Sequence, residues 1–456
     1  MRQRSRGRAT LAAVAAMCAV AALPGQAYGA DGPAAYQFDP KAKAVTGAEV
    51  NTDATVLTAG SVYRSSIKFG QKLYYRLNLE ETTNAYVSAV VVPKDGGKVA
   101  YGDGIAISIR DKSDLQCSSE DARFESAEYP RPIAAYAYRN VKKGSSSCQG
   151  AGTYNVLIER ENEDTSGRGD WELEIRYASE PQLAKGGSTP TKAPENWPSA
   201  SPKPPTRGDD NRRHGGSSYY DATSLETGEW RDEVVPGQTL FYRVPVDWGQ
   251  QIFATAGLGN STVPDEDEYV SGALAMSLDN PAHGRVGNAS PMSYSGRPAS
   301  MSLDPVPPVA YENRFASRSS VSAMRFAGWY YLSVTLSPEV AKPYGSKPFP
   351  LTLSVTVKGA AGDTPYAGDA GIFGVTQGDK DMARNGQSGP QAAESESRSS
   401  NMKLLGAAGI GAGAVLVLGL GGWMLLARRG QAAAAAPAGT ADGAPQQPYG
   451  GPPQAW

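Results

Sequence analysis

An octapeptide occurs twice in this chain, and the repeat constrains the fold more than any other feature of the sequence. Residues 70–77 read GQKLYYRL, and residues 237–244 read GQTLFYRV. Further on, GTYNVL at 152–157 has a counterpart in GWYYL at 328–332. Because the matching segments recur in the same order at a long spacing, each repeating unit is a whole domain rather than one turn of a solenoid. The sequence therefore predicts two related domains in tandem.

Both units are predicted to be β. Within the octapeptide, residues such as Leu73 and Tyr75 alternate with their neighbours, and a period of two places them on the core face of a strand. The same pattern makes Tyr242 the counterpart of Tyr75 in the second core. Short apolar runs separated by Gly, Asp and Asn, with no long amphipathic helix, are typical of antiparallel sandwiches. We therefore predict an all-β fold with two antiparallel β-sandwich domains, at 46–178 and 219–358.

The chain begins with the pattern of an export signal. A basic segment containing four arginines precedes an uncharged run over 9–23, and small residues follow up to Ala30. That run is too short to cross a ~30 Å hydrocarbon core at ~1.5 Å per residue. We therefore expect residues 1–30 to be a cleaved signal peptide. Cys18 follows Met17, where a lipid-modified cysteine would need a small residue, so lipoprotein processing is not favoured.

A second uncharged run, at 404–427, lies between basic residues near the other end of the chain. Its length predicts one C-terminal transmembrane helix. The flanking positive charges are balanced, so the orientation follows from the export signal: an extracellular N-terminal part and a cytoplasmic tail at 428–456. Within this run, Gly409 and Gly413 form a GxxxG pair that allows two helices to approach closely. The alternative is that small residues simply fill the span.

Two cysteines remain after the signal peptide, Cys117 and Cys148. In an exported chain we expect them to form a disulfide, which would contribute roughly 3 to 4 kcal/mol by restricting the unfolded chain. Two separate buried thiols are the alternative. A catalytic thiol is disfavoured because neither His214 nor His283 lies in a recognisable site motif.

The strand at 70–77, followed by AYVSAVVVP at 85–93 and the cysteine pair, resembles a known domain type. It is similar to the bacterial pre-peptidase C-terminal (PPC) domains of actinobacterial secreted or membrane-anchored surface proteins, some of which lie beside von Willebrand factor A domains. The resemblance implies jelly-roll-like sandwiches with an accessory role, and some relatives bind calcium or matrix polymers. Here the nearest acidic cluster, 265–268, lacks the spaced ligands and turn glycine of a calcium loop. It is interpreted as a solvated loop.

The remaining segments are connectors and one unusual region. Residues 185–216 are rich in proline and are predicted to be a linker; a basic patch for wall polyanions is the alternative. Residues 359–403, rich in Gly, Ala, Ser and Asp, are predicted to be a stalk. The tail is of low complexity, a disordered terminus or a docking peptide. Residues 260–325 contain a repeated Ala/Ser-Met-Ser-Leu-Asp segment, interpreted as paired strands, with a binding loop as the alternative.

Composition and motifs exclude several functional classes. With 44 Lys+Arg against 46 Asp+Glu, no basic excess favours nucleic acid. Only 2 histidines disfavour histidine-based metal sites and catalysis. We find no nucleophile elbow, zinc-binding helix or phosphate loop. Glu80 and Glu81 would point to opposite faces of a strand and could not flank one bond. We therefore predict no enzymatic activity and no cofactor.

Three functions remain. The first is a non-catalytic, membrane-anchored cell-surface protein whose tandem sandwiches bind an envelope polymer or a protein partner. The second is an accessory subunit of a membrane or envelope complex, and the third is a wall hydrolase that uses carboxylates distant in sequence. For the first, the candidate contact residues are Tyr74 and Phe241, expected on the strand face opposite the core. Covering a neighbouring sheet is the alternative role for each.

Overall fold

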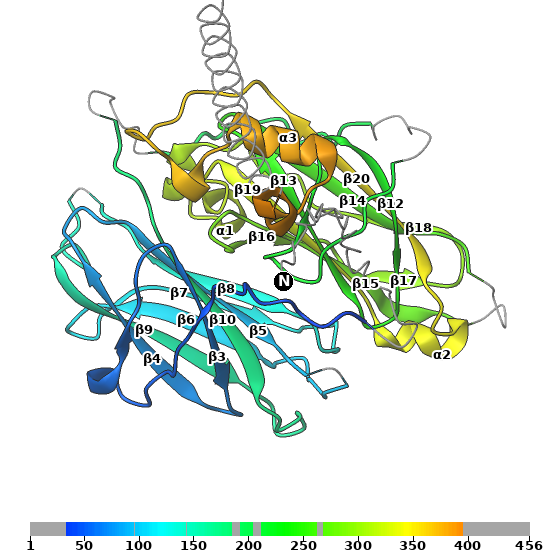
Figure 1. Ribbon diagram of the computed structural model, residues 1–456, viewed down its shortest axis with the longest axis horizontal. Helices are drawn as coiled ribbons and strands as arrows, with labels where there is room; N and C mark the ends of the chain where they lie inside the picture. Colours follow the sequence, from blue (N-terminus) through cyan, green and yellow to red (C-terminus); the bar gives the residue numbers. More distant parts are fainter. Residues whose placement is uncertain are drawn as a thin grey trace, which may run out of the picture. The chain divides into compact units, whose positions relative to one another are not determined.

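The computed structural model consists of β-strands joined by turns and short helices (Figure 1), which confirms the predicted all-β class. The residues that it describes are 33–94, 96–142, 144–184, 192–203, 211–261 and 268–394. The predicted signal peptide, the predicted transmembrane helix with Gly409 and Gly413, and the tail lie outside these residues. Within the described part, no helix is both long and apolar enough to span a bilayer. The described residues up to Gly389 belong to one compact unit.

The first sandwich has two five-stranded sheets. One sheet has the order β1 (Lys43–Ala44), β3 (Ser61–Ile67), β10 (Trp171–Ser179), β5 (Ala85–Val92), β8 (Ile133–Arg139). The other has the order β2 (Thr55–Val56), β4 (Lys72–Leu79), β9 (Gly152–Glu161), β6 (Gly104–Arg110), β7 (Gln116–Arg123). Apart from the short β1 and β2, neighbouring strands are antiparallel. The eight long strands, counted along the chain, follow the orders 1-8-3-6 and 2-7-4-5, the double Greek key of a jelly roll.

The second sandwich repeats this topology. Its four-stranded sheet has the order β12 (Gly228–Val234), β20 (Phe349–Lys358), β14 (Gln251–Leu258), β18 (Ala299–Ser302). Its larger sheet has the order β11 (Thr223–Ser224), β13 (Thr239–Val246), β19 (Gly328–Leu336), β15 (Val270–Asp279), β16 (Arg285–Asn288), and β17 (Met292–Tyr294) also pairs with β15. Without β11 and β17, the same two strand orders result.

Short helical elements lie between the strands and after the last of them. They are η1 (Asn51–Asp53), η2 (Tyr311–Phe315), α1 (Ser319–Ser322), η3 (Pro338–Val340), α2 (Ala341–Tyr344), η4 (Gly371–Phe373) and α3 (Gln377–Asn385). Six of these seven lie between residues 311 and 385, so this part of the chain accounts for most of the helical structure among the described residues.

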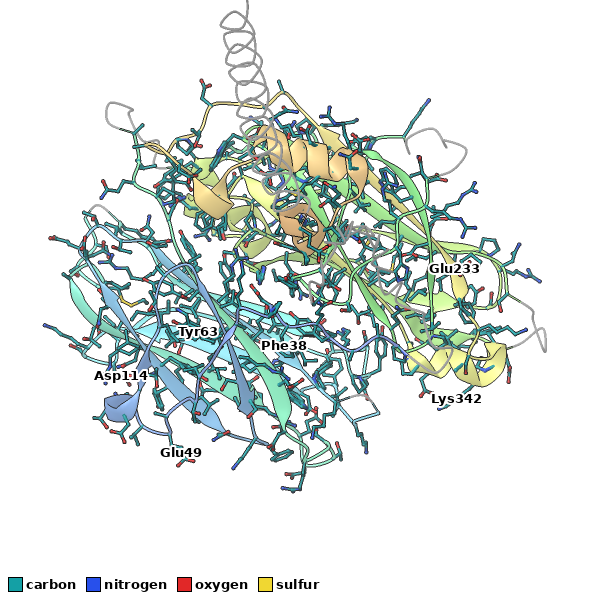
Figure 2. All side chains as sticks on the ribbon, viewed as in Figure 1. Phe38, Glu49, Tyr63, Asp114, Glu233 and Lys342 are labelled. Carbon is teal, nitrogen blue, oxygen red and sulfur yellow. A yellow bond between two sulfur atoms is a disulfide. The ribbon has the colours of Figure 1, made fainter. Side chains whose placement is uncertain are left out.

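The cores confirm the expected register of the repeat. Tyr75 on β4 and Tyr242 on β13 are both fully buried, one in each core. The hydroxyl of Tyr75 donates to Ser65 Oγ at 3.2 Å, and that of Tyr242 donates to Asp232 Oδ2 at 2.6 Å. Each buried tyrosine is therefore hydrogen-bonded, as a phenol in a core requires. Charged side chains such as Glu49, Asp114 and Lys342 are exposed on the outside (Figure 2).

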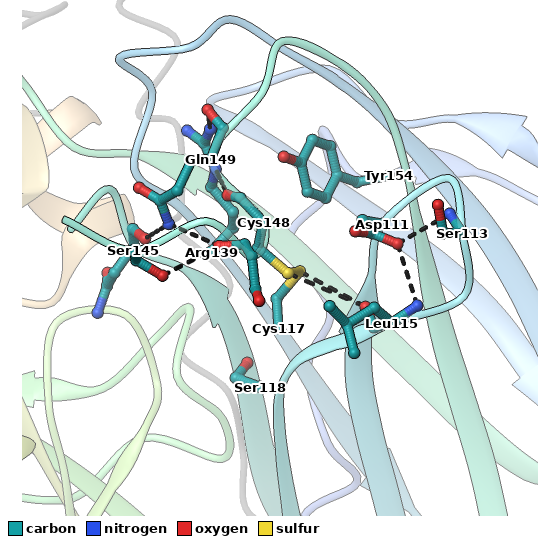
Figure 3. The surroundings of a disulfide bond; sticks show 12 residues. Asp111, Ser113, Leu115, Cys117, Ser118, Arg139, Ser145, Cys148, Gln149 and Tyr154 are labelled. Atoms are coloured by element: carbon teal, nitrogen blue, oxygen red, sulfur yellow. Dashed lines mark hydrogen bonds between the residues drawn. A yellow bond between two sulfur atoms is a disulfide. The ribbon is translucent and has the colours of Figure 1, made fainter. Parts of the chain in front are cut away.

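The predicted disulfide between Cys117 and Cys148 is confirmed, with Cα atoms 5.7 Å apart (Figure 3). It ties β7 to the loop that precedes β9. The buried guanidinium of Arg139 holds the same loop, donating to the carbonyl oxygens of Cys148 at 2.7 Å and Gln149 at 2.6 Å. The disulfide and the arginine together fix a long connection that the sequence alone leaves open.

Part of the predicted stalk is folded, and this corrects the prediction for residues 359–389. Phe373 is 1% exposed and packs in the core cluster of the second sandwich. On α3, Asp379 accepts a hydrogen bond from Trp329 Nε1 at 2.9 Å, and Thr376 forms a capping box with it. A few aromatic residues anchor the segment, although its Gly- and Ala-rich composition is typical of a spacer.

The structure also corrects details of two further predictions, those for the linker at 185–216 and for residues 260–325. The end of the predicted linker is folded, because Gly216 exchanges two backbone hydrogen bonds with Phe241. Residues 260–325 do form strands, as interpreted. However, the two repeated segments lie on β15 and β18, which belong to different sheets, so they do not pair with each other. Sequence similarity between the segments carries no information about which sheet each joins.

Candidate functional site

The two sandwiches meet face to face, and this interface contains the buried charges and the one cavity described below. On β10, Leu173 and Ile175 face the core of the first sandwich. The intervening residues Glu174 and Arg176, and Glu180 just beyond the strand, therefore lie on the opposite face. That face of the first sandwich contacts the sheet of β13, β19 and β15.

Two apolar clusters fill the interface. In one, Val90 of β5 packs with Phe241 and Tyr331 of the second sandwich. In the other, the ring of Tyr86 lies 4.9 Å from that of Phe326, edge to face. The approach is close elsewhere too: a Cβ added to Gly284 would lie 2.4 Å from the ring of Tyr136. The sandwiches are therefore packed against each other like layers of one core.

The candidate contact residues lie in different environments. Phe241 is 1% exposed, and its ring packs against Tyr219 at 5.0 Å and Tyr36 at 6.1 Å. It covers a neighbouring sheet, which corrects its assignment as an exposed contact residue. Tyr74 on β4 is half-buried, and its backbone pairs with Ala48. The two residues hold the same register position, but the sheet of β13 faces the other sandwich and the sheet of β4 does not.

At one end of the interface, Glu180 is the centre of a buried polar cluster. Arg314 of η2 donates to both carboxylate oxygens, at 2.6 and 3.1 Å. The hydroxyls of Tyr366 and Tyr86 lie 2.7 and 3.0 Å from the carboxylate, and Asn84 donates at 2.8 Å. Burial alone would raise the pKa of Glu180, but Arg314 and these hydrogen bonds lower it below the ordinary value. The carboxylate is therefore charged and fully engaged.

Further along β10, Glu174 is 4% exposed, and its Oε2 has no hydrogen-bond partner among the described residues. Burial raises the pKa of Glu174 to about 7, although Arg176 acts in the opposite direction. Arg176 Nη1 lies 3.2 Å from Nε2 of His283. Burial and then Arg176 lower the pKa of His283 well below its usual value, so this imidazole is neutral and accepts the hydrogen bond.

A third buried group is Asp279 at the end of β15. It accepts hydrogen bonds from Arg285 Nε at 2.6 Å and from the hydroxyl of Tyr219 at 2.7 Å. Tyr219 also stacks on His283, with ring centroids 4.2 Å apart. Tyr219 therefore links Asp279 to the histidine through one aromatic ring.

A cavity of about 240 Å³ opens at the edge of the interface beside Arg285. Its wall comes from both sandwiches: residues 124–127 and 131–133 of the β7–β8 connection, and β15, β19 and residues 285–291. The side chains that supply charge or hydroxyl groups are Arg131, Arg285, Glu125, Ser126, Ser277, Ser290, Ser333 and Thr335.

The described residues contain no group of three or more His, Cys, Asp or Glu side chains placed to hold a metal ion. The acidic segment 265–268 lies mostly outside the described residues. Sequence reasoning missed Glu180, Arg314, Arg131 and Arg285. The charged residues that alternate along β10 and continue to Glu180 have the same pattern as a solvent-exposed strand face. No signal in the sequence therefore marks Glu180 as buried.

Comparison with known proteins gives little. No protein-family model matches the chain, and no curated protein matches it. Among solved structures, similarities were found to a putative secreted protein from Parabacteroides distasonis (7% identity, TM-score 0.16, 66% of this chain and 89% of that one) and to the plant peptide RALF23 in complex with FER and LLG2 (9%, 0.21, 73% and 98%). A third is the infectious bursal disease virus Gx strain (12%, 0.22, 66% and 59%). At such TM-scores these likenesses carry no inference about function.

Proposed function

We propose that this chain is a non-catalytic, membrane-anchored cell-surface protein whose two jelly-roll sandwiches bind an envelope polymer or an extracellular protein. The observation that carries the proposal is the interface, where the buried Arg314–Glu180 pair and two apolar clusters join the sandwiches. Two domains held in one arrangement offer a pre-organised surface, which lowers the ordering cost of binding. The buried charges of Glu180, Arg314 and Asp279 are engaged in structural bonds, as expected of a binding scaffold.

The anchoring part of the proposal rests on the ends of the sequence. An export signal over 1–30 and an uncharged span over 404–427 would place the sandwiches outside the cell and the tail in the cytoplasm. The Cys117–Cys148 disulfide supports an exported chain, because such bonds persist in oxidising compartments. Since residues 359–389 pack on the second sandwich, only 390–403 would remain as the spacer before the membrane. The jelly-roll strand order supports the resemblance to PPC-type domains.

The topology is tested by adding a protease to intact cells from which the wall has been stripped. We expect both sandwiches to be removed and a small fragment containing 404–456 to remain with the membrane. A protected ectodomain would contradict the proposed topology.

Binding is tested with the full chain purified in detergent. We expect it to retain wall material or a co-purified protein without converting it. Release of wall fragments would contradict the non-catalytic proposal, and a stoichiometric membrane partner that displaces all wall binding would favour an accessory subunit instead.

Tyr74 is the predicted contact residue that is still accessible. We expect Tyr74→Ser to weaken binding of the partner, with the fold intact. Tyr101, which is 57% exposed on another part of the first sandwich, provides the control: Tyr101→Ser should bind as the parent does. Equal binding by both variants would exclude Tyr74 from the contact surface.

A further inference from the structure

The cavity at the edge of the interface has the composition of a binding site for a small hydroxylated anion. Its first feature is Arg131, which the surrounding backbone holds in place. The guanidinium donates to the carbonyl oxygens of Ala127 at 2.6 Å and Phe124 at 3.1 Å, and it lies 5.3 Å from the ring centroids of both Phe124 and Tyr129. It makes no hydrogen bond to a carboxylate among the described residues, and its Nε makes no hydrogen bond there. The charge is therefore fixed but not neutralised by a bonded acid.

The second feature is Arg285, from the other sandwich. Its Nε is bonded to buried Asp279 at 2.6 Å, and its Nη1 donates to Asn288. Its Nη2 has no hydrogen-bond partner among the described residues. Burial lowers the pKa of Arg131; Tyr129 acts in the opposite direction, the like charge of Arg285 lowers the pKa further, and Glu125 raises it. Burial acts to lower the pKa of Arg285, but that pKa is raised, chiefly by Asp279, which outweighs burial. Both guanidinium groups line the same cavity, and an anion between them would interact favourably with both positive charges.

The third feature is a set of hydroxyls on the wall formed by β15 and β19. Ser277 Oγ and Ser333 Oγ are 2.6 Å apart, and Thr335 Oγ1 lies 2.9 Å from Thr239 Oγ1. Each such hydroxyl keeps further acceptor capacity after one hydrogen bond. The volume of about 240 Å³ is slightly below the range of roughly 300–1,000 Å³ for ordinary ligand pockets, which suits a ligand the size of one sugar ring.

We propose that this cavity binds one acidic sugar unit, a sugar ring that carries a carboxylate or a phosphate. The anionic group lies between Arg131 and Arg285, and the ring hydroxyls contact Ser277 and Ser333. Because the wall comes from both sandwiches, the site exists only when the two are packed together. The inference deepens the proposed function by naming a ligand class, and it depends on that function only for the source of the sugar.

The test is isothermal titration of the full chain in detergent with glucuronate, glucose 6-phosphate, glucose and inorganic phosphate. We expect at least one of the two acidic sugars to bind, with glucose and inorganic phosphate each at least tenfold weaker. Added salt should weaken binding. No binding of either acidic sugar to the folded parent chain would overturn the proposal, and so would equal affinity for inorganic phosphate or for glucose.

Two variants that act in opposite directions locate the site. Arg131→Gln should weaken the binding of the acidic sugar at least tenfold. Glu125 is an exposed carboxylate on the cavity wall, so Glu125→Gln should strengthen binding about threefold by removing a repulsive charge. A gain of affinity cannot result from damage to the fold. The control is Arg64→Gln, which removes an exposed arginine paired with Glu172 and should leave affinity unchanged.

If neither Arg131→Gln nor Glu125→Gln changes the affinity, the sugar binds elsewhere and the proposal is wrong. Competition identifies the source of the sugar. If the site binds the ends of a polymer, a wall polymer with acidic residues displaces glucuronate. If the ligand is a free sugar acid, only monomers displace it. A chain that retains its surface partner yet binds neither acidic sugar would refute this inference and leave the proposed function standing.

Discussion

The pKa values of Glu174 and Glu180 are shifted in opposite directions, although both residues are buried in the same interface. At Glu180, one arginine, two tyrosines and an asparagine surround the carboxylate, and its pKa falls below the ordinary value because Arg314 and the hydrogen bonds outweigh burial. At Glu174, burial dominates and raises the pKa to about 7. The difference shows that the hydrogen-bond and ion-pair partners of a buried carboxylate decide whether its pKa falls or rises in this interface. One end of the interface is fixed by an ion pair, and the other depends on pH.

The largest expected effect comes from removing the positive partner of Glu180. Arg314→Ala leaves a buried, unpaired carboxylate, which should lower the free energy of unfolding by about 3–5 kcal/mol. Denaturant titration of the purified chain measures this. Arg64→Ala breaks the exposed pair with Glu172 and should cost less than about 1 kcal/mol. A similar loss in both variants would mean that the Glu180 cluster is no stronger than a surface pair.

A smaller loss is expected when one hydroxyl is taken from the same cluster. Tyr366→Phe keeps the ring and removes the 2.7 Å hydrogen bond to Glu180. Because the acceptor is charged, the cost should be about 1.5–3 kcal/mol. The same variant should shift the acid unfolding of the chain toward higher pH, since the folded-state pKa of Glu180 rises. Unchanged stability would show that Arg314 alone maintains the charge.

At Glu174, at the other end of the interface, we expect a substitution to stabilise the chain instead of destabilising it. The folded-state pKa of Glu174 is raised, so the folded state binds a proton more tightly than the unfolded state, and the parent loses stability as pH rises from about 4.5 to above 7. Glu174→Gln removes this slope and should stabilise the chain at pH 8 by on the order of 1 kcal/mol. Glu180→Gln is the contrasting variant and should destabilise at the same pH.

Lowering the pH should reduce the stability contributed by Glu180 but not that contributed by Glu174. The lowered pKa of Glu180 contributes stability that is present above the ordinary carboxyl pKa near 4.5 and is lost as pH falls through the folded-state value. Thermal unfolding of the parent below pH 4.5 should therefore show a decline that Glu180→Gln lacks. A parent and variant with parallel profiles in that range would place the acid-sensitive group elsewhere.

Much of the fold could be predicted from the sequence, and the interface could not. The alternation around Tyr75 and Tyr242 specifies strands and their core faces, because a period of two admits one register against an apolar core. The expected export of the chain and the two cysteines beyond residue 30 predict the pairing of Cys117 with Cys148, which the structure confirms. The charge pattern of β10 is compatible with a solvated face, and the burial of Glu180 depends on Arg314 and Tyr366, which lie far along the chain. The burial of Phe241 could not be predicted for the same reason, because the octapeptide does not show which sheet faces the other domain.

Residues 359–389, the folded part of the predicted stalk, determine the order in which contacts bear a force applied at the C-terminal end of the segment. A pull applied at Gly389 first loads the bridge between Ser388 and Thr223 and the hydrogen bond that the Gln387 carbonyl accepts from Ser224 Oγ. Next it loads α3, where Trp329 and Asp379 provide a side-chain attachment. It then reaches Tyr366, whose strand bridge with Leu183 and hydrogen bond to Glu180 tie the segment to the end of the first sandwich. Tension applied from the C-terminal side should therefore detach residues 376–389 from the second sandwich before it loads either β-core. In single-molecule stretching we expect a short, low-force extension to precede the rupture of the sandwiches, and Trp329→Phe should lower the force of that first step alone.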